Sequence, residues 1–443
     1  MMFRLRSISG GVFMIKKTIL ILCFVMVIGL LLCACSNKNG TSETIASEII
    51  TSQNTNSENS TGQNANGEIS TNENAITTDY NITEEDKTIV LKNATLIDGT
   101  GAAAKPNMYI LIEDGKIKEL GTKNEVVIPS EAKVINLNGS TVLPGWINSH
   151  VHQGYDEVNL QNWLNAGVTS VRVESPGAVE NFLSERERLN SNLHNSFIVS
   201  ATPILKIKGG YGYGDAILTS PENAQSTVLD YIDKGVDIIK FSLEDSLPPG
   251  TYCEVLPAEY VKSIVDAAHS KNIKVSVHIS HAKFLSVAIN AGVDDIAHMV
   301  VDPLDSDTIK AIIAKDIYIV PTLELWKGVG WGYTASSNLS KFYQAGGKIA
   351  FGTDFAGYTM TFDKGFPITE VLQMQKAGMS NMDIIVSATK NAAHVCGLDN
   401  VIGTIEIGKK ADMFIVSGDP LKDINVLAKA KMVIHNGTVI SIN

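Results

Sequence analysis

Two histidines separated by a valine end an apolar stretch in the middle of the chain. The stretch runs from Thr141 to His152 and closes with His150-Val151-His152. Side chains two positions apart on a β-strand point to the same side, so both imidazoles would face one space at the end of the strand. Imidazole nitrogens are common ligands of transition metals such as Zn²⁺. Because a His-x-His pair is a weak motif and two ordinary histidines would look the same, the interpretation depends on further ligands elsewhere.

Other side chains that can bind metal lie at or near the ends of further predicted strands. They are Lys240 in 236–241, His278 in 273–278, His298 in 293–299 and Asp354 in 348–354. If these strands form a parallel barrel, their carboxyl ends meet at one mouth, where the active sites of such barrels are built. Several imidazoles buried in one small cavity need hydrogen bonds or a metal to compensate for lost water. The pattern therefore predicts one metal site built from these residues together with His150 and His152.

The elements that must position these residues alternate between strand-like and helix-like stretches from residue 141 to residue 398. The predicted strands are 141–152, 168–173, 196–201, 236–241, 273–278, 293–299, 317–322 and 348–354. Such alternation indicates a parallel sheet, and eight strand-helix units in this length fit a (β/α)₈ TIM barrel of the α/β class, typically ~250 residues. A doubly wound open sheet is the alternative. It is disfavoured because the glycine-rich run 209–214 does not open a helix, as a phosphate-binding loop would.

Short alternating strands flank the barrel region on both sides. Residues 86–140 and 399–443 carry apolar runs separated by turn signals, among them Glu113-Asp114-Gly115-Lys116 and Asn436-Gly437. Such turns are typical of β-hairpins. We expect the two flanks to pair into one small β-sandwich domain attached to the barrel.

The first 85 residues are expected to lie outside the folded part. A basic pair precedes an apolar run at 19–32, and the next residues, which resemble a bacterial lipobox, end at Cys35. The pattern predicts a lipoprotein signal peptide at 1–35, lipidation of Cys35 and an extracytoplasmic position on the bacterial cell membrane. An ordinary signal peptide and a single membrane anchor are the alternatives, and Met14 is an alternative start. Residues 36–85, rich in Ser, Thr, Asn and Glu, are predicted to be a disordered tether.

Composition and charge narrow the class of partner. The net charge is −11 and 44% of the residues are hydrophobic. No basic cluster stands out, so we do not expect a nucleic-acid partner. Beyond the N-terminal segment the cysteines are Cys253 and Cys396, which we interpret as two separate thiols rather than a disulfide framework.

Five motifs in this order resemble the metal-dependent amidohydrolase superfamily. They are LPGWINSHVH, GVDIIK, the strand that ends at His278, AGVDDIAHM and FGTDF, followed by the tail SATKNAAHVCGL…IGTIEIGKKADMFIVSGDPL. The resemblance covers about 89–443, and the lysine after the fourth strand is similar to that of the Xaa-Pro and Xaa-Arg dipeptidase branch. The ligand set that it implies is His150, His152 and Asp354 for one metal, His278 and His298 for the other, and Lys240, as a carbamate, for the bridge.

The resemblance also implies a chemistry. The two divalent ions, expected to be Zn²⁺, would share a water and lower its pKa, and the resulting hydroxide would attack an amide carbonyl. Asp354 would carry the proton to the leaving nitrogen. The expected reaction is hydrolysis of an amide C–N bond in a small molecule, either a dipeptide or an N-acyl amino acid.

Three further residues are candidate substrate contacts. Tyr211 stands where many relatives have the histidine of Gly-Gly-His-Gly, and it can donate a hydrogen bond but is a poor metal ligand. His281 follows the fifth strand and is either a substrate contact or a surface histidine. Arg172 lies at another strand end and could hold a carboxylate in a bidentate fork, although a structural salt bridge is the favoured interpretation.

Several other functions stay open at this stage. The nearest is a mononuclear relative of the imidazolonepropionases or deaminases, which would bind one metal and tolerate the change Lys240→Ala. Esterase or lactonase action would use the same hydroxide. A lipoprotein that binds a solute without catalysis is disfavoured because no ligand is missing. The native metal and the formation of a homo-oligomer are also left open.

Overall fold

The computed structural model describes residues 76–78, 83, 85–212, 214–246, 252–356 and 361–442. All of them belong to one compact unit, residues 70–443. Cys35 and the predicted signal peptide lie outside the described residues. The predicted tether extends too far, because Thr77 and Thr78 form a short strand, β1 (Thr77–Thr78), paired with β5 (Lys133–Asn136). In the part of the chain that the structure describes, no helix combines the length and the apolar character needed to cross a bilayer.

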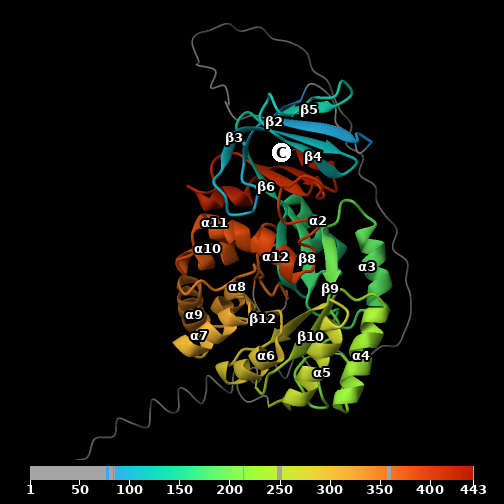
Figure 1. The fold of residues 1–443 in the computed structure, drawn as a ribbon, viewed down its shortest axis with the longest axis vertical. Helices are drawn as coiled ribbons and strands as arrows, with labels where there is room; N and C mark the ends of the chain where they lie inside the picture. Colours follow the sequence, from blue (N-terminus) through green and yellow to red (C-terminus); the bar gives the residue numbers. More distant parts are fainter. Residues whose placement is uncertain are drawn as a thin grey trace, which may run out of the picture. The chain divides into compact units, whose positions relative to one another are not determined.

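Seven parallel strands form most of a closed barrel (Figure 1). In chain order they are β7 (Trp146–Val151), β8 (Val168–Val173), β9 (Phe197–Ser200), β10 (Ile238–Ser242), β11 (Lys274–His278), β12 (Asp295–Ala297) and β13 (Tyr318–Val320). Each strand pairs in parallel with the next, from β7 to β9 and from β10 to β13. A parallel bridge between Ala201 and Ile238 joins the two groups.

The eighth barrel position is an irregular segment, although the sequence predicts a strand at 348–354. Its bridges to the neighbouring strands, both parallel, are Ile349 to Ile319 and Phe355 to Val151. Asp354 has a left-handed backbone, with φ of 59°, and this conformation is incompatible with a regular strand ladder. The segment nevertheless closes the ring. The predicted α/β fold is therefore confirmed as a TIM-barrel-like arrangement.

The apolar stretch that ends in His152 is divided between two sheets, whereas the sequence predicts one strand. Residues 141–144 form β6 (Thr141–Pro144), which pairs with strands of the small sheet, and β7 then opens the barrel. Gly145 stands at the break, where a Cβ atom would lie 2.1 Å from Oγ1 of Thr169. Only glycine allows this close approach. The boundary between the two sheets therefore falls at residue 145 rather than at 140.

Helices follow the barrel strands. They are α2 (Glu157–Asn165), α3 (Phe182–Asn190), α4 (Pro221–Asp233), α5 (Ala258–His269), α6 (Leu285–Ala291), α7 (Ser306–Ala314), α8 (Leu323–Gly328), α9 (Gly332–Gln344), α10 (Ile368–Lys376), α11 (Asn381–Val386) and α12 (Ala392–Val395), with short 3₁₀ turns at Ala282–Phe284 and Ile424–Ala428 and a π turn at Ser387–Asn391. The side chains of Asp156, Ser220 and Asp305 accept hydrogen bonds from the first free N–H groups of α2, α4 and α7. Such caps fix where these helices begin.

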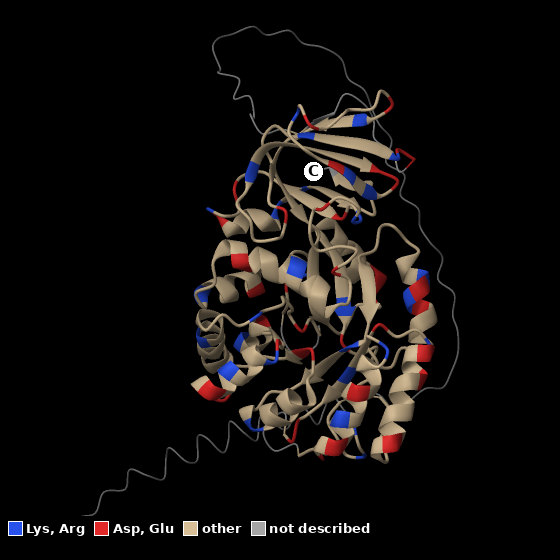
Figure 2. Ribbon diagram, viewed as in Figure 1, with Lys and Arg blue, Asp and Glu red and all other residues tan. Residues whose placement is uncertain are grey.

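Each outer helix buries one face against the barrel. In α5 the buried residues include Val261, Ile264, Val265 and Ala268, spaced three and four positions apart as on one helix face. Charged residues of both signs lie along the outer helices and the loops (Figure 2). The apolar faces therefore pack the helices against the strands. The carboxyl ends of the strands are not used for this packing and can position the site.

The two flanks of the chain combine in one nine-stranded sheet. Besides β1, β5 and β6 it contains β2 (Thr88–Leu96), β3 (Lys105–Glu113), β4 (Lys116–Gly121), β14 (Met413–Val416), β15 (Ala430–His435) and β16 (Thr438–Ile442). The predicted turns are present, with positive φ at Asp114, Gly115, Asn436 and Gly437. A separate apolar core, with Ile89, Ile110, Met413 and Ile434 among its members, packs within this sheet. The strands are hydrogen-bonded into one sheet, so a two-layer sandwich stays a prediction.

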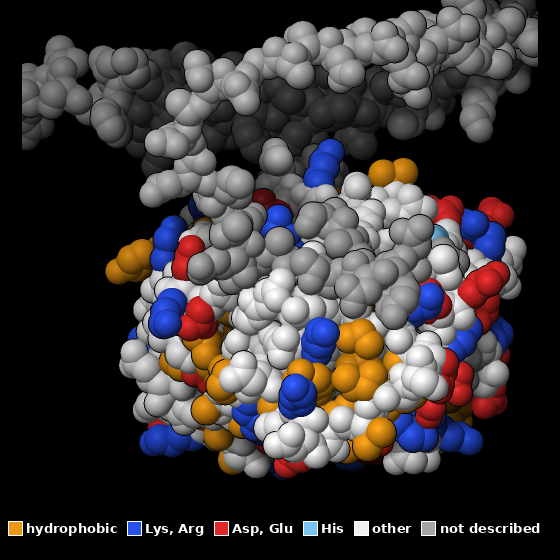
Figure 3. Space-filling model, turned by 90° about the horizontal axis from the view of Figure 1, so that it is seen from above, with side chains coloured by type: hydrophobic (Ala, Val, Ile, Leu, Met, Phe, Trp, Pro, Cys, Tyr) orange, Lys and Arg blue, Asp and Glu red, His pale blue; other side chains and the backbone are white. Residues whose placement is uncertain are grey.

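The surface carries both signs of charge. On the face that Figure 3 shows, basic and acidic side chains are interspersed, with hydrophobic side chains between them. Several exposed charges form ion pairs within a helix, as Lys262 and Asp266 do in α5 at 2.7 Å. Such exposed pairs stabilise a helix only slightly.

Candidate metal centre

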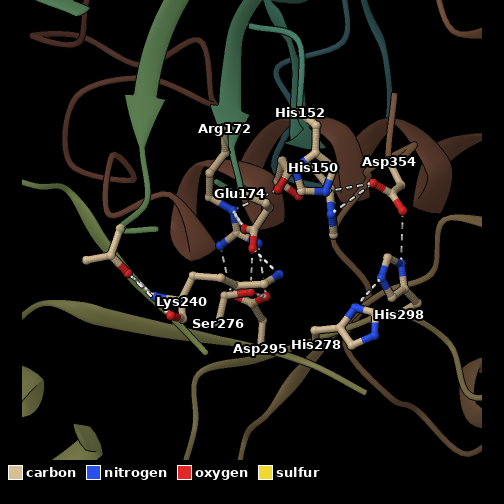
Figure 4. A network of polar contacts seen from close by, with 12 residues as sticks. His150, His152, Arg172, Glu174, Lys240, Ser276, His278, Asp295, His298 and Asp354 are labelled. Carbon is tan, nitrogen blue, oxygen red and sulfur yellow. Dashed lines mark hydrogen bonds and ion pairs between the residues drawn. The ribbon is translucent and has the colours of Figure 1, made fainter. Parts of the chain in front are cut away.

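A cavity of about 170 Å³ opens at the carboxyl ends of the barrel strands. Most of the residues singled out in the sequence line it, namely His150, His152, Tyr211, Lys240, His278, His298 and Asp354, together with Gln153, Ser175, Gly177, Ile204, Gly212 and Ala356. Figure 4 shows the imidazoles and Asp354 close together. We call His150, His152, His278, His298 and Asp354 the cavity group. Barrel closure is what brings these distant segments to one point.

The first part of the cavity group comes from β7 and the irregular eighth segment. Oδ1 of Asp354 lies 3.0 Å from Nε2 of His152 and 3.4 Å from Nε2 of His150. Among the described residues, these three form the one group of three or more that could hold a metal ion. The backbone N–H of Asp354 donates to the carbonyl of His150 at 2.9 Å, so the two segments are held in register at this point.

A pair of side chains reinforces the same register. The amide of Asn148 donates to Oγ1 of Thr353 at 2.9 Å, and its Oδ1 accepts the N–H of Thr353 at 3.2 Å. Both residues are buried. Because Asn148 stands two positions before His150 and Thr353 stands directly before Asp354, this pair helps to fix the distance between the two strand ends.

The second part of the cavity group is a pair of histidines from β11 and the end of β12. Nε2 of His298 lies 3.0 Å from Nδ1 of His278. On the far sides of the rings, Nδ1 of His298 lies 2.7 Å from Oγ1 of Thr322, and Nε2 of His278 lies 3.5 Å from Oε2 of Glu244. The ring of Tyr211 is stacked on His278 at 4.4 Å between centroids.

The donor atoms of the cavity group fit a divalent metal ion. Both ring nitrogens of His150 and Oδ1 of Asp354 are buried without a hydrogen-bond partner, which is unusual for buried polar atoms. Two donors bound at ~2.0–2.1 Å to one tetrahedral ion lie roughly 3.3 Å apart. The separations of 3.0 and 3.4 Å from Asp354, and of 3.0 Å between His278 and His298, are close to that value.

Three imidazoles of the cavity group, those of His150, His278 and His298, are held in the form that binds metal. Burial lowers the pKa of His150 to about 4, against the opposing effect of Asp354. Burial also lowers the pKa of His278 and holds the pKa of His298 well below its usual value. Neutral imidazole is the species that coordinates a metal, so these histidines need lose no proton to do so at neutral pH.

Lys240 belongs to a second buried cluster, which we call the ionic network and which consists of Arg172, Glu174, Lys240, Ser276 and Asp295. Nζ of Lys240 contacts Oε2 of Glu174 directly. Nε of Arg172 lies 2.5 Å from Oε1 of Glu174. The guanidinium also grips Asp295 in a bidentate fork, at 2.8 and 2.9 Å. Two cations are therefore balanced by two carboxylates.

The structure keeps two of the candidate substrate contacts out of the cavity lining, and for Arg172 it agrees with the favoured interpretation, a structural salt bridge. Arg172 is fully buried and is engaged by Glu174, Asp295 and backbone carbonyls, so it forms the structural ion pair rather than a fork for substrate. His281 does not line the cavity; its Nδ1 lies 3.1 Å from Asp302. Tyr211, by contrast, does line the cavity.

Four residues of the site escape sequence reasoning. They are Glu174, Glu244, Asp295 and Thr322, each of them buried. Glu174 and Glu244 follow strand ends, and Asp295 lies within AGVDDIAHM. A strand-end acid next to the ligand candidates was the available signal. Thr322 offered none, because its contact with His298 depends on a left-handed backbone, with φ of 48°.

Known proteins are similar to this chain in sequence. A profile of the amidohydrolase family matches residues 238–440. An imidazolonepropionase of Clostridium tetani is 24% identical over 376 residues, which cover 70% of this chain and 84% of that protein. A 5-methylthioadenosine/S-adenosylhomocysteine deaminase of Carboxydothermus hydrogenoformans is 24% identical over 372 residues, with coverage of 74% and 84%.

A solved structure is similar to most of this chain. A Xaa-Pro dipeptidase with methionine bound in its active site has a TM-score of 0.69 and 26% identity, and the alignment covers 80% of this chain and 100% of that one. The region matched by the family profile contains Lys240, His278, His298 and Asp354. Residues 238–440 are thus similar to the amidohydrolase family, and the chain is an enzyme that acts on carbon–nitrogen bonds.

Proposed function

We propose that the chain hydrolyses the amide C–N bond of a dipeptide or an N-acyl amino acid with two divalent ions held in the cavity. The observation that carries the proposal is the convergence of two sets of imidazole nitrogens on one cavity, one beside Asp354 and one between His278 and His298. The likeness to the Xaa-Pro dipeptidase, at 26% identity, supports the choice of substrate.

The proposed ligands divide into two sets. One ion is assigned to His150, His152 and Asp354, the other to His278 and His298, and a carbamate on Lys240 is assigned to the bridge. Nitrogen and carboxylate donors of this kind suit Zn²⁺. When bound, the ions would polarise the scissile carbonyl and acidify a water molecule. This division of the ligands between two ions is why we propose a binuclear centre, as in the dipeptidase-like branch.

Asp354 is the proposed proton carrier. Its carboxylate borders the cavity, with Oδ1 3.0 Å from Nε2 of His152. Burial favours the neutral acid, but His150 and His152 keep the pKa of Asp354 well below its ordinary value. The carboxylate is therefore ionised at neutral pH, can accept a proton from water, and can deliver it to the leaving nitrogen.

The remaining lining would bind and orient the substrate. Gln153, Ser175 and Tyr211 offer neutral hydrogen-bonding groups, while Ile204 and Ala356 offer apolar contact. An uncharged amide needs both kinds of surface, since its polar edge must be matched when it leaves water. Tyr211 in particular would contribute a hydroxyl where many relatives use an imidazole.

The experiment is metal analysis of the full chain followed by a hydrolysis screen. We expect about two divalent ions per chain, turnover of dipeptides or N-acyl amino acids, and activity that increases with bicarbonate, which supplies the carbamate. Metal-replete protein that turned over no dipeptide, N-acyl amino acid, cyclic amide or ester would contradict the proposal.

A second candidate function rests on the contact between Lys240 and Glu174. As an ammonium, Lys240 completes the charge balance of the ionic network, whereas a carbamate would add a third anion beside Glu174 and Asp295. That contact favours a mononuclear enzyme that opens a cyclic amide or deaminates a base. Both relatives compared by sequence, an imidazolonepropionase and a deaminase, support it. One ion per chain and an active Lys240→Ala variant would select this function over the first.

We also propose that the enzyme is lipidated at Cys35 and works on the outer side of a bacterial cell membrane. The support is the apolar run at 19–32 and the lipobox-like residues that follow it. Mass spectrometry of the N-terminal peptide from membrane extracts tests the assignment. A diacylated Cys35 is expected, and an unmodified chain that still contains residues 1–34 would contradict it.

A further inference from the structure

His278 and His298 are each contacted by a different polar residue on the side away from their shared contact. We propose that Glu244 and Thr322 are positioning residues that fix which nitrogen each histidine turns toward the cavity. Neither residue belongs to the motifs that carry the family resemblance, and neither is among the residues that line the cavity. The inference rests on the proposed metal site, since it concerns how two of that site's ligands are oriented.

The position of Thr322 is fixed by its left-handed backbone and by Glu370, a residue far away in the sequence whose side chain binds the next two N–H groups. Thr322 is fully buried at the end of β13, and its φ of 48° is rarely adopted by a β-branched residue. The two N–H groups that follow it, of Leu323 and Glu324, donate to the buried carboxylate of Glu370 at 2.9 and 2.5 Å. This arrangement fixes the strand-to-helix turn and places Oγ1 of Thr322 2.7 Å from Nδ1 of His298.

Glu244 is fixed in a comparable way on the other histidine. It is 1% exposed, and its Oε1 accepts the N–H groups of Asp245 and Ser246 at 3.1 and 3.2 Å. Its Oε2 accepts the hydroxyl of Ser280 and lies 3.5 Å from Nε2 of His278. The 3.5 Å separation is long for a hydrogen bond, but Nε2 of His278 is buried without any other partner, so Glu244 is the acceptor that lies nearest to that nitrogen.

The two contacts select opposite nitrogens. With Nδ1–H of His298 donating to Thr322, the lone pair of Nε2 faces the cavity. With Nε2–H of His278 donating to Glu244, the lone pair of Nδ1 faces the same point. The facing nitrogens, 3.0 Å apart, would then both be free to bind one cation. Outer groups of this kind set the tautomer and the orientation of ligating histidines.

Removal of the Thr322 hydroxyl tests the inference. The full chain is prepared as wild type, Thr322→Val, Thr322→Gly and Thr322→Ser, and Zn²⁺ affinity is measured by competition with a chromophoric chelator. We expect one of the two bound ions to be held about 10–100-fold more weakly in Thr322→Val and Thr322→Gly. Thr322→Ser keeps the hydroxyl and is expected to restore most of the affinity. Glycine suits the positive φ, so Thr322→Gly serves if the valine variant does not fold.

Substitution of Co²⁺ adds a readout that a merely structural role would not move. The visible absorption of bound Co²⁺ depends on its ligands, so a change confined to one of two ions is expected in Thr322→Val and in Glu244→Gln. Thr169→Val is the matched control, because it also removes a buried strand hydroxyl but one without a hydrogen-bond partner and away from the cavity lining.

The outcomes separate this inference from the proposed function. Wild-type protein that binds no ion would defeat the proposed metal site itself. Wild-type protein that binds metal, together with Thr322→Gly and Glu244→Gln variants that bind it with unchanged affinity and an unchanged Co²⁺ spectrum, would overturn the positioning role alone.

Discussion

The cavity group and the ionic network are both buried and both polar, but their atoms are satisfied differently. In the network, the guanidinium of Arg172 contacts two carboxylates and two backbone carbonyls. In the cavity group, both nitrogens of His150, Nε2 of His278 and Oδ1 of Asp354 are without a hydrogen-bond partner, whereas the network has one such atom among those that pair, Oε1 of Glu174, and that atom lies against the guanidinium of Arg172. The two clusters meet at Lys240, which pairs with Glu174 and also lines the cavity.

This difference indicates what each cluster does. A buried polar atom without a partner costs free energy, so several such atoms gathered at one cavity indicate a place where a ligand would complete them. Paired buried charges need no further partner, and removing one of them leaves the other exposed to a poorly solvating interior. The cavity group should therefore control metal binding and catalysis, whereas the ionic network should control stability.

The largest expected effect is on catalysis. Asp354→Asn removes the proposed proton carrier while keeping the shape of the side chain, and kcat/KM is expected to fall by about 10²–10⁴-fold. Thermal unfolding of the metal-free chain should change little, because Oδ1 of Asp354 makes no hydrogen bond that the fold depends on. Asp399→Asn is the control, since that residue pairs with His394 at 2.8 Å outside the cavity lining. If Asp354→Asn and Asp399→Asn were equally active, the catalytic role assigned to the cavity group would be wrong.

A substitution in the ionic network should act on stability instead. Arg172→Met leaves Asp295 without its cation and Glu174 with Lys240 alone, and the free energy of unfolding in urea is expected to fall by about 3–5 kcal/mol. The exposed Arg188, which pairs with Glu185 at 2.7 Å, provides the control. Arg188→Met is expected to cost at most about 1 kcal/mol. If both variants lost the same small amount, the network would not have the structural role assigned to it.

Metal removal should lower stability by an intermediate amount. An ion that binds only the folded chain stabilises it by about 2.7 kcal/mol at a free concentration one hundred times Kd. We expect dialysis against a chelator to lower the Tm, Zn²⁺ to restore it, and His150→Ala to reduce the response. A Tm that did not depend on the metal would place the unpartnered atoms of the cavity group outside any metal site.

The smallest expected effect is a pH dependence away from both clusters. A hydrogen bond to Asp294 raises the pKa of His269 above its usual value, against the opposing effect of burial. A raised pKa stabilises the folded chain at low pH, and this contribution is lost as the pH rises through the raised value above 6.5. His269→Gln should therefore flatten the change in unfolding free energy over that range, by no more than about 1 kcal/mol. If His269→Gln and the wild type showed the same pH dependence of unfolding free energy, the pair of His269 and Asp294 would not contribute to stability.

Prediction from the sequence was most reliable where a pattern is local. The apolar run at 168–173 coincides with β8, and the turn at Asn436 has the expected backbone. It was less reliable where backbone geometry depends on distant packing. Gly145 splits one apolar stretch between two sheets because Thr169 lies against it, and the irregular eighth segment follows from the left-handed backbone of Asp354.

In the candidate site, too, local patterns predict some residues and not others. Strand-end positions were enough to gather the cavity group, because barrel closure brings all carboxyl ends to one mouth. The partners of those residues were not foreseen. Glu174 meets Lys240 from 66 positions away in the chain. For Arg172 the sequence favours a salt bridge over a substrate contact, but it does not identify Asp295 as the partner. Side-chain pairing across a barrel depends on strand register, which local periodicity does not specify.

The metal content of the full chain, purified without chelators and measured by elemental analysis, tests the central claim most directly. We predict about two divalent ions per chain in the wild type and about one after His278→Ala. A well-folded chain that binds no divalent ion at stoichiometric level would contradict the account.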